Sequence, residues 1–129
     1  MEFIYYFANA SLTERILNYL LKQLRTHVDC ITVLFLNDRW VMRIKLDAPL
    51  DQDYCQDCWA VLNENGFPYQ PAIHMSRALK DLDAGDASVS VMNRHQVVIV
   101  SHGVPNPEEI FDFRDQFVQG LGYCPQSLA

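Results

Sequence analysis

Hydrophobic and polar positions along the chain alternate or recur in ways that predict a sequence of strands and helices. Residues 2–7 are rich in aromatics and predict a strand. The next apolar positions recur every three to four residues, which is typical of an amphipathic helix over about 12–27. The motif Ser11-Leu12-Thr13-Glu14 predicts that a capping box opens this helix. An unbroken apolar run at 31–36 indicates a strand that is covered on both faces of a sheet.

The pattern of residues 40–46 alternates, so we expect a half-buried strand that pairs with 31–36 through a turn at Asn37-Asp38. Arg43 and Lys45 would then lie on the solvent-exposed face of the sheet. A helix is expected from Asp51 or Asp53 to about Glu64, ended by Asn65-Gly66.

The pattern of apolar positions weakens between residues 67 and 86. The prolines at 68 and 71 hold this region extended, and 76–82 predict a short helix. Residues 88–92 and 96–100 predict a hairpin around Asn93-Arg94. A last helix is expected over 107–119, and 122–129 are expected to form a loose tail.

Together these elements predict one α+β domain over residues 1–129, with a mostly antiparallel sheet and the order βαββα followed by ββα. The βαββα part resembles the ferredoxin-like split βαβ architecture, extended by a hairpin and a C-terminal helix. This resemblance concerns architecture and implies no activity.

Size and charge narrow the class of protein. Half of the 129 residues are apolar and 12% are aromatic, which is enough for a core without disulfides. The net charge of −6 argues against nucleic acid as a partner, since phosphate binding needs clustered Lys and Arg.

No apolar run approaches the roughly 20 residues that span a bilayer, so no membrane partner is expected. The N-terminus lacks a basic signal region and the four cysteines form no disulfide pattern, so we expect a cytoplasmic protein with reduced thiols.

Cys55 and Cys58 are three residues apart in the helix predicted at 51–64, and they would share one face. Two thiolates on one face are able to bind a metal ion or to form a disulfide, and zinc is the candidate metal. However, the sequence contains no second paired motif to complete a zinc site. The alternative is that both thiols are small hydrophobic groups in the core.

Ser101-His102-Gly103 are expected at a junction between a buried strand and a helix N-terminus, where free backbone N–H groups favour ligands. His102 is then a candidate general base or proton switch, and the protein would be a small enzyme or ligand-binding domain. The alternative is a structural loop with an ordinary surface histidine. The sequence shows no catalytic constellation, which favours a non-catalytic role.

The leading hypothesis is a small cytoplasmic regulatory or adaptor domain that acts through protein–protein contact as a homodimer. The partner would be another protein, with a basic patch that complements the acidic chain. Four residues are the predicted interaction surface: Arg43, Lys45, Phe67 and Tyr69. Phe67 and Tyr69 are candidate aromatic anchors for a partner, and Tyr123 is another.

Overall fold

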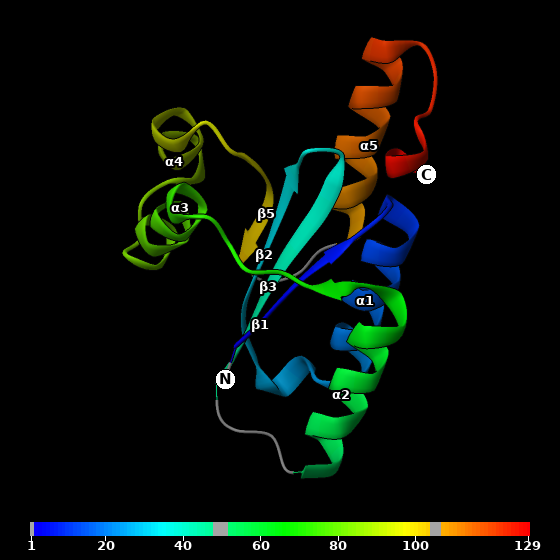
Figure 1. Ribbon diagram of the computed structural model, residues 1–129, viewed down its shortest axis with the longest axis vertical. Helices are drawn as coiled ribbons and strands as arrows, with labels where there is room; N and C mark the ends of the chain where they lie inside the picture. The colour runs from blue at the N-terminus through cyan, green and yellow to red at the C-terminus, as the bar shows by residue number, and fades with distance from the viewer. Residues whose placement is uncertain (1, 48–51, 104–106) are drawn as a thin grey trace.

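A five-stranded antiparallel sheet organises the chain in the computed structural model, which describes residues 2–47, 52–103 and 107–129 (Figure 1). The strands follow the order β4-β1-β3-β2-β5, and every neighbouring pair is antiparallel. The predicted α+β class is confirmed. The strands are β1 (Glu2–Phe7), β2 (Val28–Leu36), β3 (Arg39–Leu46), β4 (Phe67–Pro68) and β5 (Val98–Gly103).

Helices cover both faces of the sheet (Figure 1). One face packs against α1 (Ala10–Gln23), α2 (Gln52–Asn65) and α5 (Pro107–Leu121). The opposite face packs against α3 (Ile73–Asp83) and α4 (Ser88–His95). A short 3₁₀ turn follows α1 at Arg25–His27, and another follows α5 at Gln126–Leu128.

Strand alternation divides the core into two clusters. Side chains such as Phe7, Trp40 and Ile44 pack under α1 and α2, while Leu34 and Val41 pack under α3 and α4. Residues 31–34 of β2 are fully buried because this strand lies between β3 and β5 and is covered on both faces, as its unbroken apolar run predicts.

The β2–β3 turn and the first helix show how local chemistry sets the boundaries. Asn37 and Asp38 adopt φ angles of 51° and 60°, which these two residue types tolerate, so the predicted turn is confirmed. The capping-box prediction is wrong, since α1 begins at Ala10 and Ser11 lies inside it. Asn9 is the cap: its side chain accepts a hydrogen bond from the Leu12 N–H at 2.9 Å. Asp51, one of the two predicted caps of the next helix, lies outside the described residues.

The predicted hairpin at 88–100 is wrong in its first half, because Ser88–His95 form the helix α4. Val89 and Val91 alternate with serines, which is a pattern typical of a strand. Of these two valines only Val91 is buried, and it packs in the second core cluster with α3 and the sheet. Tertiary packing outweighs the weak β propensity of this short segment. Gln96 ends the helix in a left-handed conformation, with φ of 58°.

The C-terminal segment, residues 122–129, is not a loose tail in this structure. Leu128 is buried in the first core cluster, and the Trp40 Nε1–H donates a hydrogen bond to the Ser127 carbonyl oxygen at 2.7 Å. The Arg114 Nε–H donates to the Leu128 carbonyl oxygen at 2.6 Å. These contacts hold the segment against α5, which the sequence-based interpretation missed because the segment has no periodic pattern.

No helix within the described residues is long and apolar enough to cross a bilayer.

Candidate functional site: an aromatic pocket beside Arg39

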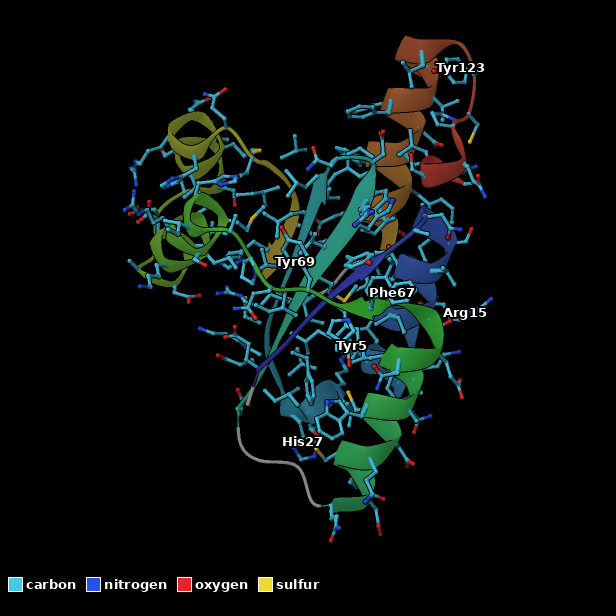
Figure 2. All side chains as sticks on the ribbon, in the orientation of Figure 1. Tyr5, Arg15, His27, Phe67, Tyr69 and Tyr123 are labelled. Atoms are coloured by element: carbon cyan, nitrogen blue, oxygen red, sulfur yellow. The ribbon has the colours of Figure 1, made fainter. Side chains whose placement is uncertain are left out.

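Three aromatic rings and one guanidinium gather where β1, β3 and β4 meet on the α3–α4 face of the sheet. The Tyr6 ring stacks on Phe67 with centroids 5.3 Å apart and meets Tyr69 edge-on at 6.2 Å. The Arg39 guanidinium carbon lies 4.7 Å from the centroid of the Tyr6 ring, which is a cation–π contact. Figure 2 shows Phe67 and Tyr69 on the segment that leads from α2 to α3. We call these four residues, together with the recess beside them, the Arg39 pocket.

The register of the strands places these side chains on one face. Tyr6 pairs with Val41 of β3 and with Phe67 of β4, so the three residues face the same way. The Tyr69 N–H donates a hydrogen bond to the Ile4 carbonyl oxygen at 2.9 Å, which keeps the chain against β1 after β4 ends.

Gly66 makes this close approach possible. A Cβ atom at Gly66 would lie 2.5 Å from both Phe7 Cδ1 and the Tyr6 carbonyl oxygen, so no other residue fits without displacing β1. The predicted end of α2 at Asn65-Gly66 is confirmed. The role of Gly66 differs from the expected one. A glycine that ends a helix commonly adopts a positive φ angle, but Gly66 does not, and it is needed here for close packing against β1.

A recess of about 230 Å³ opens among Tyr6, Leu36, Asn37, Arg39, Val41 and Tyr69. This volume is below the roughly 300–1,000 Å³ of typical small-molecule sites, and it suits a single inserted side chain. Leu36 and Val41 supply an apolar floor, and Arg39 supplies a cation at the rim. Arg39 is exposed and makes no ion pair within the described part of the chain.

The edge of the sheet beside the pocket is poorly suited to strand addition. β4 has only two residues, and one of them is Pro68, which has no backbone N–H to donate. Recognition at this edge therefore depends on side chains, and Phe67 is the most prominent of them, with 61% of its surface exposed.

Of the four predicted interaction residues, the structure brings Phe67 and Tyr69 together and separates Arg43 and Lys45 from them. Arg43 is only 2% exposed, and its two Nη atoms donate to the Asp83 carboxylate at 2.8 and 2.9 Å. The Lys45 ammonium lies 3.0 Å from the same carboxylate. The prediction of a wet basic face is wrong at Arg43, because α3 covers that part of the sheet and supplies Asp83.

Tyr6 and Arg39 of the pocket were not among the four predicted interaction residues, and the sequence contains a signal for Arg39. Arg39 has the same strand parity as Val41 and Arg43, so the alternation alone places it on the α3–α4 face. Its approach to Tyr6 depends on the pairing of β1 with β3, which a single sequence does not reveal. Tyr5 points to the other face, where its hydroxyl donates to the Asn63 side-chain oxygen at 2.8 Å.

Ser101, His102 and Gly103 belong to the strand β5 and not to a loop before a helix, so the predicted boundary at residue 100 is wrong. Ser101 is buried, and the His102 Nδ1 lies 2.7 Å from the Thr32 hydroxyl oxygen. Burial, followed by the Arg43 charge, lowers the pKa of His102 below its usual value. The Cys30 sulfur lies 3.7 Å from the same nitrogen. His102 is thus a half-buried imidazole on the edge strand β5, in surroundings that favour its neutral form.

Cys55 and Cys58 lie on α2 as predicted, and the structure distinguishes them. Cys58 is fully buried in the first core cluster, while Cys55 is half-buried. Burial, followed by the neighbouring Cys55, raises the pKa of the Cys58 thiol to about 11, which disfavours the thiolate that a metal or a disulfide reaction requires. No group of three or more His, Cys, Asp or Glu side chains among the described residues is arranged to hold a metal ion.

Comparisons with known proteins place few constraints on the chain. No protein family and no curated protein matches it. A solved structure, the C-terminal domain of YpbH, shares 19% sequence identity with a TM-score of 0.45, and the match covers 58% of this chain and 76% of that one. This likeness is too distant to carry an argument about function.

Proposed function

We propose that this protein is a small cytoplasmic regulatory or adaptor domain that acts by binding another protein. The observation that supports the proposal is the Arg39 pocket, in which an exposed guanidinium that makes no ion pair with any described residue lies over an aromatic ring beside a small recess. Tyr, Trp and Arg are the residues that most often dominate the binding energy of protein interfaces. The recess fits one apolar side chain of a partner, and Arg39 would pair with a carboxylate next to it.

The two other functions considered have weaker support. A metal or thiol-redox role would use Cys58 as a thiolate, although burial keeps its proton bound. An enzyme or ligand site at Ser101-His102-Gly103 would need an accessible His102, although this imidazole is packed beside Thr32 and Cys30. The exposed pocket is therefore the better candidate.

The proposal includes a homodimer. Among the described strands β5 pairs with β2 on one side only, and its six residues are long enough for a second β5 strand to pair with them. Native mass spectrometry of the untagged protein tests this: a dimeric mass that becomes monomeric in Val98→Lys supports it. A wild-type monomer at micromolar concentration contradicts it.

The binding proposal predicts that substitutions in the Arg39 pocket remove a partner without unfolding the domain. Tagged wild type and the variants Arg39→Gln and Phe67→Ser are purified from cells, and the retained proteins are quantified by mass spectrometry. Both side chains are exposed, so each substitution should weaken a specific partner by about 1–2 kcal/mol, or about fivefold to thirtyfold.

Arg77→Gln and Val89→Ser are matched controls, because they change an exposed arginine on α3 and an exposed apolar residue on α4. They should retain the partner. If no protein distinguishes the pocket variants from these controls, the pocket is not the binding site.

A further inference from the structure

A second apolar recess lies on the other side of the β2–β3 turn, between α5 and the C-terminal segment. Its volume is about 490 Å³, and its lining residues are Phe35, Asp38, Phe117, Leu121, Tyr123, Pro125, Gln126, Ser127 and Leu128. We call it the α5 groove. Figure 2 shows Tyr123 on the segment after α5, apart from Phe67 and Tyr69, so the groove is distinct from the Arg39 pocket.

The groove is preformed by packed aromatic rings and by hydrogen bonds to the C-terminal segment. Phe35 lies 5.4 Å from Phe113 and 5.9 Å from Phe117, measured between ring centroids. The hydrogen bonds from Trp40 to Ser127 and from Arg114 to Leu128 hold the opposite wall. A preformed groove loses little conformational entropy when it binds a ligand.

Large apolar side chains remain open to solvent along this groove. Phe117, Leu121 and Tyr123 are 40%, 46% and 63% exposed. Phe117 and Leu121 are one helical turn apart on α5, so they present a continuous apolar stripe. Such a stripe matches the apolar face of an amphipathic segment from a partner protein.

The charges of Asp38 and of α5 favour a positively charged ligand in the groove. Asp38 is the charged residue among those that line it, and Asp38 makes no ion pair within the described part of the chain. α5 carries four carboxylates and one arginine, and that arginine donates to the Leu128 carbonyl oxygen. In a second copy of this chain the groove would again present Asp38 and the negatively charged α5, so charge disfavours self-association here, and it disfavours an anionic lipid surface for the same reason.

We propose that the α5 groove binds a basic amphipathic segment of another protein. Apolar side chains of that segment contact Phe117, Leu121 and Tyr123, and a Lys or Arg next to them pairs with Asp38. This inference does not rest on the Arg39 pocket, which has the opposite charge and would take a different segment.

Selection from a random dodecapeptide library displayed on phage, with the intact protein as bait, tests the inference. The selected peptides are synthesised with a fluorescent label, and their affinities are measured by anisotropy. One class of peptides should combine apolar residues with Lys or Arg. Leu121→Ser should weaken this class by about tenfold, and Asp38→Asn, which keeps a residue suited to the turn, by about threefold.

Val89→Ser and Glu64→Gln are the controls, since both positions are exposed and lie outside the groove. Arg39→Gln should leave this class of peptides unaffected and should weaken only peptides that bind at the Arg39 pocket, so the two proposals fail or succeed separately. The inference is overturned if no basic class is selected, if that class binds Leu121→Ser as tightly as wild type, or if Leu121→Ser instead dissociates a homodimer.

Discussion

His102 is a half-buried imidazole whose protonation would add a positive charge near Arg43 and Lys45. Burial first and the Arg43 charge next lower its pKa, and the nearby Asp83 carboxylate opposes them in part. The neutral imidazole is therefore the form that the folded protein favours, with the Thr32 hydroxyl as its hydrogen-bond partner.

This placement predicts an acid-sensitive contribution to stability. A histidine in the unfolded chain titrates near about 6.5, so the unfolded state takes up the proton first as pH falls. The free energy of unfolding should decrease below that pH and level off below the lower pKa of the folded state. Urea denaturation at several pH values gives the free energy of unfolding of wild type and of His102→Gln. The value for wild type minus that for the variant should decrease as pH falls through this window. An NMR titration that gives His102 a pKa above 6.5 in the folded protein would contradict the prediction.

Single residues were predictable where their own chemistry decides the outcome. Asn37 and Asp38 tolerate positive φ angles, and Gly66 marks the end of α2. Burial of Arg43 was not predictable, because the alternation of β3 assigns it a face but says nothing about the helix that covers that face. The same limit applies to Cys58, whose place in the core depends on how α2 docks.

At the scale of the element, α3 is fastened to the sheet by charge as well as by apolar packing. Asp83 is the last residue of α3, and both of its carboxylate oxygens accept hydrogen bonds from Arg43 of β3. Burial raises the pKa of Asp83, but hydrogen bonds from Arg43 and Lys45 outweigh this effect and lower it overall. Within the described residues, the buried Arg43 guanidinium donates hydrogen bonds to Asp83 and Thr32, and its Nε has no hydrogen-bond partner.

Asp83→Ala should therefore destabilise the fold strongly, because it leaves the Arg43 charge buried without a partner. Removing one member of a buried pair costs about 3–5 kcal/mol, and we expect the lower end, since about a third of the Asp83 side chain is exposed to water. The double variant Arg43→Met/Asp83→Leu should recover most of the loss.

Urea denaturation measures these variants, with Asp86→Ala as the control because its partner Arg94 is exposed. Equal losses for Asp83→Ala and Asp86→Ala would contradict the special role of Arg43.

Elements with strong periodic patterns were predictable, and those defined by tertiary packing were not. The helix at α1 follows from an apolar pattern that recurs along its whole length, and the β2–β3 hairpin follows from two apolar runs that flank the turn at Asn37-Asp38. α4 was mistaken for a strand because eight residues with alternating valines contain too little periodicity to separate the two structures. β5 extends three residues beyond its predicted end, where Ser101, His102 and Gly103 pair with β2.

At the scale of the whole molecule, two aromatic surfaces of opposite charge lie on either side of one turn. Leu36, Asn37 and Arg39 line the Arg39 pocket, whereas Phe35 and Asp38 line the α5 groove. Phe35 and Leu36 are successive residues of β2 and face different surfaces, and the turn residues Asn37 and Asp38 also line different surfaces. The proposed adaptor role requires separate sites for separate partners, and these two surfaces are the candidates for them.

The site as a whole was only partly predictable. Exposure of Phe67 and Tyr69 was expected from the irregular, proline-containing segment in which they lie, but only Phe67 of the two is exposed, and Tyr69 is half-buried against the second core cluster. Their assembly with Tyr6 and Arg39 depends on three strands that are distant in sequence, and the α5 groove depends on the docking of residues 122–129. Long-range pairing of this kind leaves no local pattern in one chain.

The central claim is that the Arg39 pocket binds another protein. The most direct measurement is the ¹H–¹⁵N NMR spectrum of the labelled intact protein, recorded with and without the partner fragment that Arg39→Gln and Phe67→Ser fail to retain. We predict chemical-shift changes concentrated at Tyr6, Leu36, Arg39, Phe67 and Tyr69. Changes confined to Cys55 and Cys58, or to Ser101, His102 and Gly103, would contradict the account and would move the functional site to α2 or β5.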